Sequence, residues 1–508
     1  MASNSILGSP TSVTPLAIGM GIGALFLSYL AVSTFLTWYR LRSFPGPFLA
    51  SFSYLWLLRA DISGDNGRIR HEMSKKYGPV TRIGPRELLV SDIDQIKRST
   101  GARGTYKRSV WYRDTRVNPY HPMVFNLMDT AEHDRRKAKL MVGYSGRDNL
   151  SMEAEIDGVV REFVACVRDR YAAAPFRPLD LATYTSYFTL DAISKVAYGK
   201  SFGYLARGDD IHGYLKTMRT TLPTMPATSD IPALGSFFGS TFFLNLFGPK
   251  ITDKRGFGVL MKIGHELVKD RFAPDAKPQS DMMGAFVRMG LTQDQCESES
   301  LLQIIAGTDT TATALCQGVL HLMSSPRTYL ALQQEIDASA PRLSTPPTIA
   351  EIDTLPLLKA VALETLRIHP PFTGTAYKEV PAGGDTIHGV FVPAGTRVAQ
   401  DYIGTARSPA VFGDDAEVFR PERWLEADAA RRAEMRATTE LCFGNGRWQC
   451  AGKAVALMEL HKALFELLRN FDFRLLNPAT PLKSVNYNLY IQSDMWVHVT
   501  DRVKPTSS

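Results

Sequence analysis

The sequence predicts a mainly α-helical protein that carries one separate apolar helix at its N-terminus. Three observations support this fold class. Residues 15–39 contain no charged side chain, a helical pattern extends from about residue 298 to 324, and another begins at Lys453. Hydrophobic residues make up 44% of the 508 residues, which is ample for a core that encloses a cavity.

The first element, segment 15–39, is long enough to cross a membrane. A helix of this length spans roughly 37 Å, against about 30 Å of hydrocarbon. A cleaved signal peptide would have a shorter apolar run and a basic start, and no Lys or Arg precedes this segment. Because Arg40 and Arg42 follow it, the positive-inside rule places the N-terminus in the lumen and the remaining chain in the cytosol.

The sequence Phe44-Pro45-Gly46-Pro47 predicts a stiff, non-helical joint after this helix. We therefore divide the chain into a membrane anchor at residues 1–43, a proline-rich hinge at 44–47, and a main domain at 48–508.

The long helical pattern near residue 310 contains the hexapeptide Ala306-Gly307-Thr308-Asp309-Thr310-Thr311. Glycine is costly in a helix interior, and threonine hydroxyls can bond back to the preceding turn and open the helix locally. Such an opening leaves space for a small ligand and water. A kinked structural helix is the alternative.

Glu364 and Arg367 lie on one face of a predicted helix at 357–369 and have apolar neighbours. A charged pair in such surroundings needs further hydrogen-bond partners. Taken alone, this spacing is also typical of an ordinary surface ion pair.

Segment 443–452 predicts a loop that presents the sulfur of Cys450 to a metal. Gly444 and Gly446 permit the positive φ angles of a tight turn, so that backbone N–H groups can point at a thiolate. Gly452 allows the helix that begins at Lys453 to approach a flat group, and the N-terminus of that helix stabilises an anionic ligand. A glycine-rich turn with a buried, inert cysteine is the alternative.

In this order, these motifs resemble those of the cytochrome P450 family, the haem-thiolate monooxygenases, over nearly the whole chain. The resemblance implies a mainly α fold with small β-sheets (α+β) and a haem b whose iron is bound by Cys450. The family usually has a basic residue two positions before the cysteine, whereas here Trp448 holds that place and Arg447 stands one earlier.

The resemblance also assigns roles to the other motifs. It implies that Asp309 and Thr310 support proton delivery during oxygen activation. It further implies that Arg423, in Pro421-Glu422-Arg423-Trp424, joins Glu364 and Arg367 in a structural lock for the cysteine loop. The implied cofactor-binding residues are His133, Lys137, Ala306, Gly307, Lys378, Phe443, Arg447 and Gly452.

Three of these residues are predicted to bind the haem propionates. His133 and Lys137 match the family's helix C, and Lys378 falls where the family often has an arginine. Lysine would supply a single charged ammonium group, whereas arginine would supply a planar guanidinium that can donate two parallel hydrogen bonds. A solvated surface charge is the alternative for each residue.

The implied function is a monooxygenase of the endoplasmic reticulum membrane that inserts one oxygen atom from dioxygen into a lipophilic small molecule. Its electrons would come from NADPH through NADPH-cytochrome P450 reductase, with cytochrome b5 as a further partner. The cysteine loop and segment 486–496 are similar to filamentous-fungal members, many of which act in secondary metabolism. The alternatives are a redox-neutral haem-thiolate isomerase or dehydratase, and a membrane haem sensor or electron carrier.

Composition agrees with a cytosolic domain that does not bind nucleic acid. The five cysteines are odd in number and scattered, which is typical of a reducing compartment. The net charge of +7 is spread along the chain, without an arginine-rich arm or zinc finger. In the implied fold, Arg135, Arg136, Lys139, Arg447 and Lys453 would gather on one side as a docking face for an acidic electron donor, or would be solvated charges.

Two regions are predicted to admit and hold an apolar substrate. The phenylalanines of segment 236–247 could enter the membrane, although a core helix is equally compatible with their spacing. In segment 372–376, Thr373 and Thr375 are expected hydrogen-bond partners for the substrate.

Overall fold

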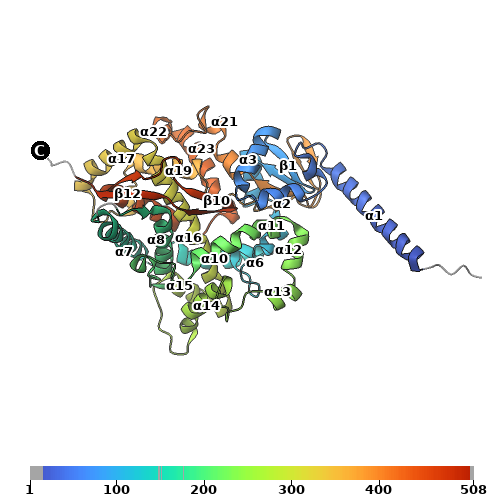
Figure 1. Ribbon diagram of the computed structural model, residues 1–508, viewed down its shortest axis with the longest axis horizontal. Coiled ribbons are helices and arrows are strands. Elements are labelled where there is room, and N and C mark those ends of the chain that lie inside the picture. The colour runs from blue at the N-terminus through green and yellow to red at the C-terminus, as the bar shows by residue number, and fades with distance from the viewer. Residues whose placement is uncertain (1–14, 147–148, 150, 175–176, 504–508) are drawn as a thin grey trace, which may run out of the picture.

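A computed structural model describes residues 15–146, 149, 151–174 and 177–503. They form a helical body with small sheets, from which one long helix projects (Figure 1). The predicted α+β fold class is confirmed. The longer helices are α1 (Pro15–Arg40), α3 (Asn66–Tyr77), α4 (Ile93–Thr100), α6 (Thr130–Tyr144), α7 (Met152–Val167), α8 (Leu181–Tyr198), α10 (Tyr214–Thr221), α14 (Phe257–Val268), α16 (Gln293–Met323), α17 (Pro326–Ser339), α19 (Pro356–Ile368), α23 (Ala429–Thr439) and α24 (Lys453–Asn470).

Shorter helices connect these elements. They include α2 (Leu55–Asp61), α5 (Val110–Asp114), α9 (Tyr204–Arg207), α11 (Met225–Asp230), α12 (Pro232–Phe238), α13 (Thr241–Phe247), α15 (Met282–Arg288), α18 (Ile349–Ile352), α20 (Tyr402–Ala406), α21 (Pro409–Phe412) and α22 (Arg423–Glu426). The strands are β1 (Val80–Gly84), β2 (Glu87–Val90), β3 (Lys107–Arg108), β4 (Leu179–Asp180), β5 (Lys378–Glu379), β6 (Asp385–Ile387), β7 (Val390–Val392), β8 (Arg397–Gln400), β9 (Phe471–Leu475), β10 (Lys483–Tyr487), β11 (Leu489–Ser493) and β12 (Trp496–Asp501).

The core is built around α16, which packs against α8, α14, α19 and α24. Almost every side chain of α8 is buried, which explains why that helix has little amphipathic pattern. α16 begins five residues before the predicted start because Thr292 caps it. The Thr292 hydroxyl accepts from Gln295 N at 3.3 Å, and Gln295 Oε1 accepts from Thr292 N at 3.1 Å.

Among the described residues, four sheets lie around this helical core, and the smallest of them include the β6–β7 hairpin. The largest has the strand order β1-β2-β8-β5-β3, with β2 and β8 parallel. A three-stranded sheet has the order β4-β12-β9, and the β10–β11 hairpin contacts α16 and α8. The sheets therefore bring residues near 378 and 490 next to elements formed much earlier in the chain.

The helix α1 leaves the body and exposes most of its apolar side chains from Ile18 onward (Figure 1). Within the described residues, the segment Ile18–Arg40 is the one helix long and apolar enough to cross a membrane. Its 26 residues correspond to roughly 39 Å of helix.

The joint between α1 and the body is held by Arg82. Its guanidinium donates to the carbonyl groups of Trp38 at 3.1 Å, Thr37 at 3.2 Å and Ser51 at 3.0 Å, and Arg82 N donates to Pro45 O at 2.8 Å. A Cβ on Gly46 would come within 2.1 Å of Arg82 O. The proline-rich segment is thus packed on β1, which agrees with a stiff joint.

Candidate active site

The middle of α16 carries the predicted oxygen-activation motif. Thr308 Oγ1 donates to Ile304 O at 2.6 Å, and Thr310 Oγ1 donates to Ala306 O at 2.9 Å, so both hydroxyls bond back to the preceding turn as expected. Ala306 is exposed and Thr310 half-buried although they lie midway along the central helix. This face of α16 is therefore accessible to solvent inside the helical body.

Gly307 packs closely against α8. A Cβ at this position would come within 2.9 Å of Ile193 Cγ1 on α8. The missing side chain therefore allows α16 and α8 to approach closely, and the packing gives no support to the prediction that Gly307 leaves room above a haem.

The carboxyl group of Asp309 is surrounded by protein and accepts a hydrogen bond from Tyr214 Oη on α10, at 3.0 Å to Oδ2. Burial raises the pKa of Asp309 to about 7, and the bond from Tyr214 opposes this rise. Near neutral pH, the carboxyl group therefore exists in both protonation states, as a proton-transfer group requires. Tyr214 was not predicted as a site residue.

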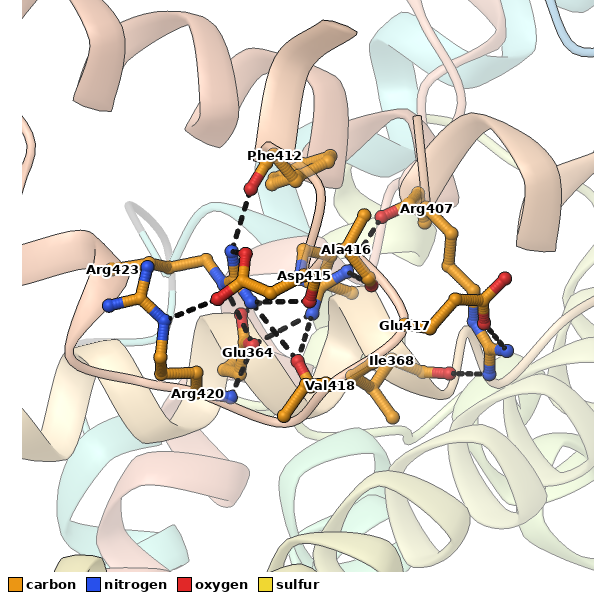
Figure 2. Close-up of polar contacts among 12 residues, drawn as sticks. Glu364, Ile368, Arg407, Phe412, Asp415, Ala416, Glu417, Val418, Arg420 and Arg423 are labelled. Atoms are coloured by element: carbon orange, nitrogen blue, oxygen red, sulfur yellow. Dashed lines mark hydrogen bonds and ion pairs between the residues drawn. The ribbon is translucent and has the colours of Figure 1, made fainter. Parts of the chain in front are cut away.

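Glu364, Arg367 and Arg423 form a buried cluster, of which Figure 2 labels Glu364 and Arg423. Arg367 donates to both carboxylate oxygens of Glu364, at 2.8 and 2.7 Å, and Arg423 Nε donates to Glu364 Oε1 at 3.1 Å. Trp424 Nε1 and the backbone N–H of Arg420 complete the bonding of this carboxylate, at 2.9 and 2.8 Å.

The two guanidinium groups also hold the chain that precedes the cysteine loop (Figure 2). Arg367 donates to the carbonyl groups of Ala406 and Val418, and Arg423 donates to those of Phe412 and Val418. The predicted third partner, Arg423, is thus in contact with the pair, and the cluster fixes the course of segment 406–424.

The cysteine loop is closed by a hydrogen bond from Cys450 N to Phe443 O at 2.6 Å. Gly444 and Gly446 have φ angles of 76° and 57°, as the sequence predicted for a tight turn. A Cβ on Gly446 would lie 2.7 Å from Ala102 N, so the loop also packs tightly against the end of α4. α24 begins at Lys453, as predicted, and packs against α16.

The thiol of Cys450 is reachable by solvent, yet protein atoms surround it closely enough that burial raises its pKa. The backbone N–H groups of Gly452 and Lys453, and the charges of Lys137 and Lys453, oppose that rise. The net effect of the surrounding protein is therefore to disfavour the free thiolate, and these N–H groups and lysines reduce that penalty. Cys442, by contrast, is packed against the core, and burial raises its pKa to about 12.

Two buried cations flank Trp448 in this loop. Lys378 Nζ lies 3.8 Å from the indole centroid and has no hydrogen-bond partner among the residues that the structure describes, and Arg108 Cζ lies 4.5 Å from the same ring. Burial lowers the pKa of Lys378 well below its usual value, and Arg108 and Lys137 lower it further. Arg108, on β3, was not predicted as a site residue. Nothing in the short segment around it indicates that it would meet the cysteine loop.

The other predicted propionate residues have protein partners. His133 packs 4.7 Å from Trp448, and burial lowers its pKa to about 4, so it can contribute a hydrogen bond but not a charge at neutral pH. Lys137 Nζ donates to Arg447 O at 2.7 Å. Arg447 binds Asp134 Oδ2 at 3.0 Å and the carbonyl of Ala102.

Two further expectations are altered by the structure. Thr373 Oγ1 donates to Asn486 at 2.8 Å and Thr375 Oγ1 donates to Asp230 at 2.7 Å, so both buried hydroxyls already serve the fold rather than a substrate.

In the predicted docking face, Arg136 is buried beside Glu132, and Lys453 pairs with Glu440 at 2.7 Å. Among these residues, Arg135 is exposed and Lys139 half-buried.

Comparison with known proteins identifies the class. Residues 44–493 match the family model for cytochrome P450, and the chain belongs to this family. It is 46% identical over 495 residues to cytochrome P450 monooxygenase ABA1 of Pyricularia oryzae, which covers 95% of this chain and 97% of the relative. It is 42% identical to cytochrome P450 monooxygenase aba1 of Botryotinia fuckeliana (91% and 92%), and 37% identical to abl1 of Leptosphaeria maculans (88% and 81%).

The predicted family, its fungal affinity and the monooxygenase class are therefore confirmed. The family carries a haem bound through a cysteine thiolate. The residues around Trp448 fit this cofactor because Lys378 Nζ and Arg108 Nε are buried donors without hydrogen-bond partners. Buried cations are costly unless paired, and two propionates would supply the missing negative charge.

Proposed function

We propose that this protein is a membrane-anchored haem-thiolate monooxygenase that inserts one oxygen atom into a lipophilic small molecule in fungal secondary metabolism. The observation that carries the proposal concerns the cysteine loop. It holds the accessible Cys450 thiol, and the buried, unpartnered Lys378 lies against its Trp448. The haem bound there supplies the oxidation chemistry, and thiolate ligation favours cleavage of the O–O bond.

In this proposal, Cys450 is the iron ligand, and Phe443 and Gly452 shape its loop. Arg108 and Lys378 supply the charges for the propionates in place of the basic residue that Trp448 replaces. His133, Lys137 and Arg447 support these groups through the contacts described above, and Ala306 borders the reaction space.

Asp309 and Thr310 move protons on the α16 side. The Asp309 carboxyl group, with a pKa of about 7, can both give and accept a proton at neutral pH. Thr310 is positioned by its bond to Ala306 O and can hold a water molecule for that transfer. Glu364, Arg367 and Arg423 act only as the lock that holds the loop.

The proposed domain division is an anchor at 1–43, a hinge at 44–47 and a catalytic domain at 48–508. We place the anchor in the endoplasmic reticulum membrane, with the catalytic domain in the cytosol. α12 and α13 support a second contact with the lipid bilayer, because Phe237, Phe242 and Phe247 are between 56% and 72% exposed. In Figure 1, these helices lie in the half of the body from which α1 projects.

The proposed electron donor is NADPH-cytochrome P450 reductase, with cytochrome b5 as a second donor. A redox-neutral isomerase would need no such partner, and it could dispense with proton delivery to dioxygen by Asp309 and Thr310. A sensor or electron carrier would give no oxidised product.

The test is turnover by the full chain in microsomes with NADPH, the reductase and ¹⁸O₂, applied to a fungal metabolite extract. We expect a product that gains one labelled oxygen atom and depends on NADPH. Product formation without NADPH would instead identify the isomerase, and haem binding without any product from the extract would favour a sensor or carrier.

A further inference from the structure

A pocket of about 470 Å³ opens at the end of the body opposite α1. It is formed by the turn after α7, the first half of α8, the end of α9 and the start of β12. In Figure 1, α7, α8 and β12 lie on the side of the body away from α1. Small-molecule sites have volumes of roughly 300–1,000 Å³. The predicted haem and substrate residues, all of which the structure describes, do not line this pocket.

Three arginines give the pocket its charge. Arg170, Arg177 and Arg207 line it, and no carboxylate of the described residues forms an ion pair with any of them. The acidic side chain in the lining, Asp180, already accepts a hydrogen bond from the Thr183 hydroxyl at 2.5 Å. Three arginines and one aspartate leave the lining with two net positive charges, which a bound anion would neutralise.

Two further acidic residues lie beside the pocket, and both are bonded elsewhere. The Asp210 carboxylate accepts from the backbone N–H groups of Leu215 at 3.2 Å and Lys216 at 3.0 Å, at the start of α10. Asp209 Oδ1 accepts from Asp210 N at 2.8 Å. These carboxylates therefore serve the turn before α10 and leave the arginines free for a ligand.

The fold holds Arg170 in position. This residue lies in a π-helical turn, η3 (Arg168–Ala172), that continues α7, and its guanidinium donates to Ala206 O and to Tyr184 Oη. A Cβ on Gly208 would lie 2.6 Å from Arg170 Nη1 and 2.8 Å from Tyr184 Oη. The glycine, with a φ of 71°, therefore lets the chain pass close to the guanidinium. π-helical turns are rare and frequent at functional sites.

Aromatic side chains form the remaining wall of the pocket. Tyr171, Tyr184 and Tyr187 are buried, and burial raises the pKa of Tyr171 and raises that of Tyr187 to about 12. The phenols therefore stay neutral and add no negative charge. Trp496, at the start of β12, is 43% exposed. Its indole offers a flat surface on which a planar ring can stack.

We propose that this pocket binds a nucleoside phosphate, a molecule that joins a planar base to phosphate groups. Guanidinium groups bind phosphate oxygens through pairs of parallel hydrogen bonds, and the net charge of the lining matches an anion with more than one negative charge. The base stacks on Trp496 at the mouth of the pocket. In the proposed membrane orientation, this end of the body lies away from the bilayer (Figure 1), so we assign a soluble ligand rather than a lipid headgroup.

The first experiment measures ADP binding to the full-length haem protein by isothermal titration calorimetry and by the thermal unfolding midpoint. We expect ADP to bind and to raise the midpoint, because it bridges four segments of the folded chain. Arg170→Gln should weaken binding about tenfold through the loss of a charge-assisted pair of hydrogen bonds. Arg170→Lys should recover only part of this loss, since lysine restores the charge but not the planar donor pair.

Two other arginine variants separate a lost contact from a damaged fold. Arg207 is exposed and has no ion-pair partner within the described residues, so Arg207→Gln should leave the stability of the free protein unchanged. We expect it to weaken ADP binding about tenfold. The matched control is Arg161→Gln, at an exposed arginine of α7 that does not line the pocket, and it should bind ADP as the wild type does.

The second experiment tests the base through Trp496→Ala. Stacking of a base on an aromatic ring is commonly worth a tenfold or larger change in affinity. Trp496→Ala should therefore weaken ADP binding about tenfold and leave the binding of inorganic pyrophosphate unchanged. In the wild type, pyrophosphate should bind more weakly than ADP, and adenosine should not bind measurably.

Three results would overturn the proposal. Wild-type protein that binds no ADP would remove the site. Equal ADP affinity in the wild type, Arg170→Gln and Arg207→Gln would place the nucleotide elsewhere on the protein. Equal affinity for ADP and pyrophosphate, or full ADP affinity in Trp496→Ala, would show a plain anion site without a base. None of these measurements uses turnover, so they decide the inference independently of the proposed monooxygenase function.

Discussion

At the scale of single residues, the two neighbouring cysteines of the loop differ in their surroundings. Cys450 is accessible and receives the N–H groups of Gly452 and Lys453, whereas Cys442 is packed against the core and burial raises its pKa to about 12. We expect Cys450→Ala to abolish the thiolate-type absorption of the reduced carbonyl complex. Cys442→Ala should retain it, and the reverse result would move the iron ligand to Cys442.

Replacing Lys378 should have opposite effects on the stability of the haem-free protein and on its affinity for haem. Its ammonium group is buried beside Trp448 without a hydrogen-bond partner. Lys378→Met should therefore stabilise the haem-free protein by about 1 kcal/mol or more, because a buried amino group without a hydrogen-bond partner is removed. The same change should weaken haem binding, measured by haem transfer to apomyoglobin. Equal haem retention would show that Arg108 suffices.

Thr310 offers a test of proton delivery that does not depend on folding. Its hydroxyl bonds only to the preceding turn, at 2.9 Å from Ala306 O, so its loss should leave α16 intact. We expect Thr310→Ala to bind haem and to keep consuming NADPH, while product formation falls roughly 100- to 10,000-fold and peroxide rises. Thr310→Ser should recover product. Unchanged coupling of NADPH to product would leave Thr310 with a structural role only.

At the scale of elements, α19 and segment 406–424 are joined through Glu364. This carboxylate receives bonds from Arg367, Arg423, Trp424 and the backbone of Arg420, and the Arg367, Arg423 and Trp424 side chains are buried away from water. Glu364→Gln should cost about 3–5 kcal/mol of stability, because it leaves the buried Arg367 guanidinium without its anion and Arg423 with Asp415 alone. Thermal unfolding and haem content would both fall.

A surface pair provides the matched control for this change. Glu426 binds Arg420 and is 61% exposed, so Glu426→Gln should change stability by less than about 1 kcal/mol. Similar losses for the two variants would mean that the buried cluster is not the lock of the cysteine loop.

At the scale of the whole molecule, α1 meets the body through a rigid joint rather than a loose tether. Arg82 binds the carbonyl groups at the end of α1, and Gly46 packs directly on β1. The orientation of the body relative to the helix axis is therefore fixed by the fold. This orientation also brings the exposed phenylalanines of α12 and α13 to the half of the body that carries α1.

The anchor leads to a prediction about topology. Full-length protein in microsomes should resist carbonate extraction, and added protease should digest the catalytic domain. Removal of residues 1–42 should weaken attachment but retain haem binding, because the core around α16 contains none of residues 18–42. If the domain is digested only after detergent is added, the orientation is inverted and a cytosolic reductase could not reach it.

The amino-acid sequence by itself determined the features that depend on neighbouring residues. The turn at Gly444 and Gly446, the start of α24 at Lys453 and the back-bonded threonines of α16 follow from local backbone freedom, capping and helical spacing. These are short-range properties, so a linear pattern is enough to reveal them.

Only the tertiary structure decided the partners of these motifs. Tyr214 meets Asp309 across 95 residues, and Arg108 and Lys378 meet at Trp448 because two strands of one sheet end beside the cysteine loop. The same packing turned Gly307 toward Ile193 and occupied the Thr373 and Thr375 hydroxyls. Burial set the charges of these groups, and burial is a property of the assembled core rather than of any segment.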